Sequence, residues 1–160
     1  MTYKFEIYHH SFLEHVKSHL ANSKKAGSIF TNPKLQTPRQ IADYAWEKIK
    51  NRYAGRRMGI EIDCGEVVGL EALVPISELP SKTKTKREIR GRGKDLTGRA
   101  KGYTVWIAYG IKKPETTKLT IIAGPVKGNE NIHAFESVYP GRWAPDFTNS
   151  KFWNTHAFIR

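Results

Sequence analysis

Two segments far apart in the chain carry side chains that handle protons and bind phosphate. Residues 10–16, His-Ser-Phe-Leu-Glu-His-Val, supply two imidazoles, and residues 137–140, Ser-Val-Tyr-Pro, supply a hydroxyl and a phenol. RNA can be cleaved without a metal because its own 2′-hydroxyl is the nucleophile. A catalyst must remove that proton, stabilise the extra charge on phosphorus and protonate the leaving oxygen. Histidine, serine, tyrosine and a basic side chain together can do this, so His15, Ser137 and Tyr139 are the first candidates.

Each of these residues also has an ordinary structural interpretation. Ser137 and Tyr139 lie two apart on a predicted strand, so their side chains share one face. Tyr139 could equally be an aromatic residue that closes the strand before Pro140, with Ser137 exposed at an edge. The functional interpretation therefore depends on all the groups meeting at one place.

A metal site is the alternative use of the histidines. His15 and His19 are one helical turn apart, a spacing that can bind a metal, but no HExxH pattern or nearby carboxylate or cysteine completes a ligand set. We therefore expect proton transfer near neutral pH and no metal or other cofactor. The single cysteine, Cys64, excludes an internal disulfide and a multi-cysteine zinc site, and its place in an alternating run predicts a buried thiol.

The chain is strongly basic. It has 27 Lys and Arg against 15 Asp and Glu, which gives a net charge of +12 and a sequence pI of about 9.9. Such an excess favours a polyanionic partner, nucleic acid first, with an anionic membrane or an acidic protein as the alternatives. No apolar run approaches the roughly 20 residues of a membrane span, and no signal peptide is recognised, so we expect a soluble chain.

Over half of this charge lies in residues 81–101, where nine basic side chains face two acidic ones. Three glycines and no apolar periodicity predict a mobile loop over this range. The charged side chains of this segment could simply be solvated, or they could contact RNA phosphates, and we favour the second role. The candidate RNA-binding residues are Lys82, Lys84, Lys86, Arg87, Arg90, Arg92, Lys94 and Arg99.

Helical patterns come first in the chain and strand patterns follow. A capping box, Ser11 to Glu14, predicts a helix start, and Thr37 before Pro38 predicts a second helix that ends near Tyr53. After Gly55 the alternation predicts strands at 58–63, 67–74, 103–109, 118–123 and 133–139, with a possible strand at 155–159 and a weak edge strand at 3–8. We therefore predict one α+β domain over residues 1–160, with two N-terminal helices packed on a twisted antiparallel sheet of about five strands.

The short motifs also resemble a known family. His-Ser-Phe-Leu-Glu-His-Val, Ser28-Ile-Phe-Thr and the final Ser-Val-Tyr-Pro resemble the C-terminal ribonuclease domains of bacterial polymorphic toxins. The resemblance is above all to the RNase A-like group of contact-dependent inhibition systems, which shares a plan with barnase/EndoU/colicin/RelE toxins. That group shows His-Thr-x-x-x-His-Val, Ser-x-Phe-Thr and Thr-x-Tyr-Pro. The resemblance covers residues 9 to about 50 and 133–140, and the middle of the chain is unmatched.

The resemblance implies a role for each matched position. His15 would be the general acid or base, Ser137 would replace a catalytic threonine, and Tyr139 would keep its phenol in the site. His10 matches the family's earlier histidine, and Lys25 or its neighbour Lys24 is nearest to the family's basic residue. The chain continues 20 residues beyond Pro140, where His156 would be a second proton carrier or a packing residue.

These observations predict a metal-independent endoribonuclease of toxin type that acts on RNA, with tRNA expected, to give a 2′,3′-cyclic phosphate. The resemblance implies delivery into the cytoplasm of a target cell and an acidic immunity protein as partner. Two other classes stay open: a nucleic-acid-binding protein without catalysis, and a small basic inhibitor or interaction protein.

Overall fold

The computed structural model describes residues 2–20, 27–94, 100–145 and 149–160, with only the backbone path described at 90–94 and 100–103. The chain forms two compact units. Unit 1 comprises Met1–Glu71 and Glu115–Trp143, and unit 2 comprises Ala72–Pro114 and Ala144–Arg160.

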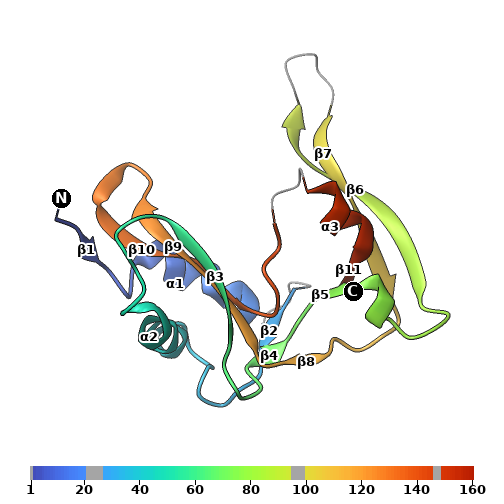
Figure 1. The fold of residues 1–160 in the computed structure, drawn as a ribbon, viewed down its shortest axis with the longest axis horizontal. Coiled ribbons are helices and arrows are strands. Elements are labelled where there is room, and N and C mark those ends of the chain that lie inside the picture. The colour runs from blue at the N-terminus through green and yellow to red at the C-terminus, as the bar shows by residue number, and fades with distance from the viewer. Residues whose placement is uncertain (1, 21–26, 95–99, 146–148) are drawn as a thin grey trace. The chain divides into compact units, whose positions relative to one another are not determined.

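Unit 1 contains a four-stranded sheet in the order β1-β10-β9-β3. The strands are β1 (Lys4–Phe5), β10 (Asn129–Pro140), β9 (Lys118–Val126) and β3 (Met58–Asp63), which are labelled in Figure 1. β10 pairs antiparallel with β9, β9 pairs antiparallel with β3, and β1 runs parallel to β10. A small second sheet joins β2 (Ile29–Phe30), β4 (Gly69–Leu70) and β8 (Glu115–Thr116).

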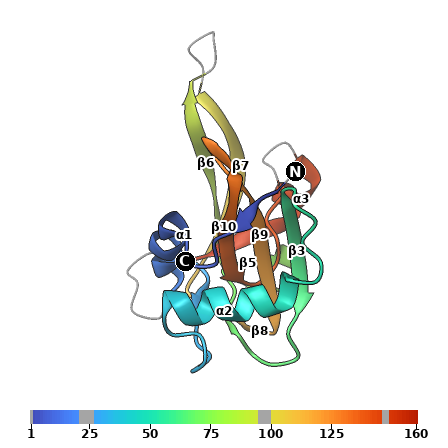
Figure 2. The same cartoon turned by 90° about the vertical axis from the view of Figure 1, so that its left-hand side faces the viewer.

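Two helices pack on the larger sheet of unit 1. α1 (His10–Val16) continues as a 3-10 turn, η1 (Lys17–His19), and its N-cap is His9, whose Nδ1 accepts from the Ser11 amide at 3.3 Å. The predicted Ser11 cap is therefore wrong by two residues. α2 (Pro38–Ile49) has the predicted Thr37 capping box, completed by Gln40. Figure 2 views the molecule from the side on which α2 crosses the strands.

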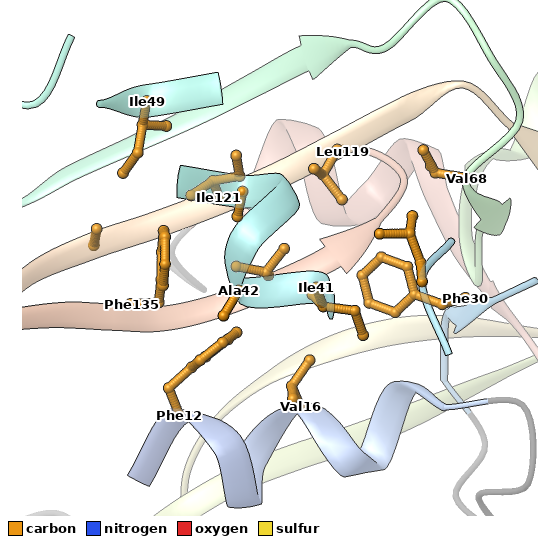
Figure 3. Packing of buried hydrophobic residues seen from close by; sticks show 14 residues of the cluster. Phe12, Val16, Phe30, Ile41, Ala42, Ile49, Val68, Leu119, Ile121 and Phe135 are labelled. Atoms are coloured by element: carbon orange, nitrogen blue, oxygen red, sulfur yellow. The ribbon is translucent and has the colours of Figure 1, made fainter. Parts of the chain in front are cut away.

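One apolar core holds both helices on this sheet. Figure 3 shows Phe12 and Val16 of α1 pointing toward Ala42 and Ile41 of α2, with Phe135 of β10 at one side. All five are almost completely buried, and each large apolar side chain buried this way stabilises the fold by about 1.5–3 kcal/mol. Because Phe12 and Val16 fix one face of α1 to the core, the neighbouring face of the same helix is held beside β10.

Unit 2 is built on a sheet in the order β5-β11-β7-β6. Its elements are β5 (Leu73–Pro75), the 3-10 turn η2 (Ile76–Glu78), β6 (Lys84–Lys94), β7 (Ala100–Tyr109), α3 (Ser150–Thr155) and β11 (His156–Ile159). β11 lies between β5 and β7, antiparallel to the first and parallel to the second. Leu73, Val105, Ile107 and Trp153 form its buried cluster.

The predicted fold class is wrong. The described residues form three α-helices and eleven strands in three sheets, mostly β, rather than two helices on a single five-stranded sheet. The sequence pattern failed most clearly at residues 81–101, predicted as a loop. The described part of this segment is a long antiparallel pair, β6 and β7, in register from Lys84 opposite Tyr109 to Gly91 opposite Gly102. Residues 84–87 and 89 are all exposed, so this half of β6, where burial is described, has no buried face and no apolar alternation.

Gly69 lies where two strands of the small sheet approach each other closely. A Cβ added at this position would lie 2.1 Å from the Ile29 carbonyl oxygen and 2.7 Å from Pro140 Cγ. We expect Gly69→Ala to lower the free energy of unfolding by about 1–3 kcal/mol, because backbone must move to admit the methyl group. Urea titration followed by circular dichroism measures this change. Gly27→Ala is the matched control, since nothing lies within 4 Å of its added Cβ; equal losses in both variants would contradict the prediction.

Candidate functional site

A β-bulge in β10 sets the direction of the two predicted site residues on that strand. The register with β9 shifts between Phe135 and Ser137. Phe135 and Val138 both belong to the core, although residues three apart on a regular strand face opposite ways. The extra residue, Glu136, resolves this conflict. Ser137 and Tyr139 consequently point away from the face that Val138 buries.

The first described contact of the site joins α1 to β10. His15 Nε2 lies 3.2 Å from Ser137 Oγ, across 122 positions of sequence. His15 is exposed and Ser137 is half-buried, and among the described residues Ser137 alone hydrogen-bonds to the His15 ring. The imidazole and the hydroxyl are thus held together at a position that solvent, or a substrate, can reach.

His19 adds a second imidazole to this site. Its ring stacks on Tyr139 with centroids 5.8 Å apart, and it meets the His15 ring edge-on at 5.9 Å. His19 Nδ1 lies 2.8 Å from the Ser28 carbonyl oxygen and 3.2 Å from Ser28 Oγ. Because a carbonyl oxygen only accepts, Nδ1 carries the hydrogen, and the lone pair of the neutral ring is on Nε2.

Three of the candidate site residues, His15, Ser137 and Tyr139, thus lie in one cluster, which Tyr139 joins through its contact with His19. Two residues of this cluster, His19 and Ser28, were not among the predicted site residues. The signal that could have found His19 is its spacing of four from His15, which is also the spacing of a metal-binding pair. In the described part of the chain, no group of three or more His, Cys, Asp or Glu side chains is arranged to hold a metal ion.

The other predicted catalytic residues are His10, Lys25 and His156. His10 is exposed in the first turn of α1, with its ring stacked on His9 at 4.5 Å. Lys25 is outside the described residues. His156 belongs to unit 2, where its ring stacks on Phe152 at 3.8 Å and its Nδ1 lies 2.9 Å from the Phe152 carbonyl oxygen. These contacts hold the ring against α3.

The predicted RNA-binding residues belong to unit 2. Lys82, Lys84, Lys86 and Arg87 are exposed. The Arg87 guanidinium lies 4.8 Å from the Trp106 ring centroid and donates to Asn154 at 3.1 Å, so this side chain is held in place. The remaining residues of the set are Arg90, Arg92 and Lys94, which are on β6, and Arg99, which is outside the described residues.

A groove follows the same helix and strand of unit 1 away from the histidine pair. It encloses about 370 Å³. Ser11, one helical turn before His15, and Glu136, the residue before Ser137, both line it. Glu136 pairs with Arg57 Nε at 3.0 Å, and this carboxylate raises the pKa of the Arg57 guanidinium. The remaining lining residues are His9, Phe12, Gly124, Pro125, Val126, Lys127, Ala134 and Phe135.

The remaining buried histidine, His133, has a structural environment. It is 4% exposed, hydrogen-bonded at Nδ1 to the Tyr53 hydroxyl and stacked on Tyr3 at 4.2 Å. Its Nε2 lies 3.0 Å from the Glu130 carbonyl oxygen. Both ring nitrogens are therefore engaged within unit 1.

Burial raises the pKa of Tyr53 to about 12 from a reference of 10.0. The folded state then keeps the phenol proton at pH values where the unfolded state has lost it, so stability falls as pH rises from 10 to 12. We expect Tyr53→Phe to make the free energy of unfolding less dependent on pH over this range, measured by urea titrations at several pH values. The other tyrosine with a strongly raised pKa, Tyr44, is unchanged in this variant. The same slope in wild type and variant would contradict the prediction.

Comparisons with known proteins give no family. No protein-family model matches the chain, and no curated protein or solved structure matches it. Within the described residues, no helix has the length and apolar character to cross a membrane. A proposal on function therefore rests on the geometry of the site, the charge of the chain and the short motifs.

Proposed function

We propose that this protein is a metal-independent endoribonuclease that cleaves RNA by attack of the substrate's own 2′-hydroxyl. The products are a 2′,3′-cyclic phosphate and a 5′-hydroxyl. The observation that carries the proposal is the contact of 3.2 Å between His15 Nε2 and Ser137 Oγ, which joins the N-terminal helix to a late strand. An imidazole and a hydroxyl at this distance can both reach one phosphate, within the ~3 Å that proton transfer and hydrogen bonding require.

The chemistry of the neighbours favours phosphate over an acyl substrate. A serine nucleophile normally stands on a sharp turn, with backbone N–H groups pointing to the oxyanion that forms. Ser137 instead lies within β10, where it pairs with Ile122 of β9. We therefore assign the Ser137 hydroxyl as a donor to a phosphoryl oxygen, with the Tyr139 phenol beside it, and His15 as a residue that moves a proton.

Charge and groove both suit RNA. The net charge of +12 attracts a polyanion and makes binding dependent on salt. Ser11 and Glu136 line the groove, and they lie one helical turn before His15 and one residue before Ser137. It offers a place for a nucleoside adjacent to the phosphate that is cut.

The motif resemblance supplies the remaining parts of this proposal. The substrate would be tRNA, and the site of action would be the cytoplasm of a target cell. An acidic immunity protein would cover the basic surface. A protein that binds RNA without cutting it is the rival, and exposed Lys84 and Lys86 would serve either function.

Cleavage in the absence of metal tests the proposal. Purified protein is incubated with tRNA and with total RNA in EDTA, beside an oligonucleotide that carries a single ribonucleotide in a DNA chain. We expect cleavage of the RNAs, and cleavage of the oligonucleotide only after its ribonucleotide, since only that position has a 2′-hydroxyl. Tight, salt-sensitive binding without cleavage would support the rival instead.

The basic strand β6 provides a separate prediction about binding. We expect the double substitution Lys84→Glu and Lys86→Glu to weaken RNA binding about tenfold or more at 100 mM salt, because both side chains are exposed and would repel phosphate. The slope of log affinity against log salt should become shallower by about one to two units. Fluorescence anisotropy with labelled RNA measures both quantities. Unchanged affinity and slope would show that these lysines do not contact RNA.

A further inference from the structure

We infer that His19 is the general base of the reaction and that the backbone carbonyl of Ser28 holds it in the tautomer that this role requires. The inference rests on the proposed function and adds a catalytic residue that the motif resemblance does not contain. In this assignment His15 is the general acid.

The first support is the orientation of the ring. His19 donates its Nδ1 hydrogen to the Ser28 carbonyl oxygen at 2.8 Å, and Ser28 is only 7% exposed, so the acceptor is fixed in the fold. A neutral imidazole held in this way has its lone pair on Nε2. It needs no tautomer change before it accepts a proton.

The second support is the place of the ring among the other groups. His19 stacks on Tyr139 and lies edge-on to His15, which contacts Ser137. The two imidazoles, with centroids 5.9 Å apart, are close enough to act on one phosphate group. Transesterification needs a base on the side of the attacking oxygen and an acid on the side of the leaving oxygen, so one site requires two proton carriers.

The third support is the difference in solvent exposure between His19 and His15. His19 is half-buried, where a neutral ring is desolvated at less cost than an imidazolium. His15 is exposed on α1. We therefore assign the more enclosed ring, His19, as the base and the exposed ring, His15, as the acid.

The resulting step is balanced without any other reactant. His19 Nε2 takes the proton of the 2′-hydroxyl, and the 2′-oxygen forms a bond to phosphorus. The bond from phosphorus to the 5′-oxygen breaks, and that oxygen takes the Nε2 proton of His15. Water then returns a proton to His15 and removes one from His19, so the site regains its starting state.

A substrate with an activated leaving group separates the two roles. RNA needs an acid to protonate its 5′-oxygen, whereas a ribonucleoside 3′-(4-nitrophenyl phosphate) loses nitrophenolate without protonation. With a ribodinucleotide, we expect His15→Ala and His19→Ala each to lose about 10²–10⁴-fold in kcat/KM. With the nitrophenyl ester, His15→Ala should recover to within about tenfold of wild type, while His19→Ala stays as defective as before.

His19→Asn tests for a merely structural role. The asparagine amide can donate to the Ser28 carbonyl as Nδ1 does, but it has no basic nitrogen. We expect this variant to have the thermal midpoint of wild type and the same loss of cleavage as His19→Ala. The acidic limb of the pH profile of kcat/KM, which reports deprotonation of the base, should disappear in both His19 variants and persist in His15→Ala.

The outcomes distinguish failure of this inference from failure of the proposed function. Cleavage by wild type and loss in His15→Ala, with His19→Asn as active as wild type, would overturn the base assignment and leave the ribonuclease proposal in place. Recovery of His19→Ala on the nitrophenyl ester would make His19 the acid and overturn it equally. Absence of cleavage by wild type on both substrates would remove the proposed function and, with it, this inference.

Discussion

Replacing His15 with alanine is expected to slow RNA cleavage by about 10²–10⁴-fold while leaving the fold intact. His15 is exposed, and among the described residues the Ser137 hydroxyl is the one hydrogen-bond partner of its ring, so the truncation removes little packing. Loss of this proton carrier removes general acid–base catalysis and so raises the activation free energy of cleavage. Rates of tRNA cleavage in EDTA measure the effect, and thermal unfolding checks that the variant folds.

Glu14→Ala is the matched control for this substitution. Glu14 lies next to His15 on the same exposed turn of α1, and its carboxylate pairs with Lys17 at 2.8 Å. An exposed pair of this kind contributes at most about 1 kcal/mol to stability. Cleavage by Glu14→Ala should stay within about threefold of wild type, well below the range expected for a lost catalytic group. An equal loss in both variants would mean that α1 is disturbed as a whole, and would contradict a specific role of His15.

Truncation of Phe12 is expected to have the largest effect on stability. Phe12 is 1% exposed, and its ring lies 5.2 Å from the Phe135 ring between α1 and β10. We expect Phe12→Ala to lower the free energy of unfolding by about 3–5 kcal/mol, because the surrounding core cannot fill the space of a phenyl ring. Urea titration followed by circular dichroism gives this value.

The same substitution should also weaken catalysis. Phe12 and Val16 hold α1 on the core, and α1 carries His15. Cleavage by Phe12→Ala should therefore fall even at a temperature where most of the protein is folded. Phe12→Leu keeps an apolar side chain there and should show a clearly smaller loss of both quantities. A change below about 1 kcal/mol in Phe12→Ala would show that α1 is not anchored in the way described here.

Local signals in the sequence predicted individual elements well. The Thr37 capping box and Pro38 placed the start of α2, and alternation placed β3 at 58–63. Both signals depend on neighbours in the chain, so no tertiary contact was needed to interpret them. The residues proposed to carry chemistry were also visible, since the types and order of His15, Ser137 and Tyr139 suit phosphate chemistry.

The arrangement of strands could not be obtained in this way. β11 lies between β5 and β7, which come from distant parts of the chain, and nothing in its four residues states those partners. Residues 84–89 of β6 form no buried face that would indicate a strand, and β6 is defined by its pairing with β7. The sequence indicated strands but not how they pair. One sheet was therefore predicted, whereas the described residues form three.

Two features of the site also depend on tertiary structure. The bulge at Glu136 sets the direction of Ser137, and the sequence shows no glycine or proline there to predict it. The role inferred for His19 depends on the backbone carbonyl of Ser28, a group that every residue has. Residue types alone could not show which histidine would be held in one tautomer.

The most direct test of the central claim is the chemistry of the ends produced from tRNA. Wild-type protein and His15→Ala are incubated with tRNA in EDTA, and the new termini are mapped and identified. The His15–Ser137 site predicts 2′,3′-cyclic phosphate and 5′-hydroxyl ends that wild type produces and His15→Ala does not. Intact tRNA with wild type, or the same cleavage with His15→Ala, would contradict it.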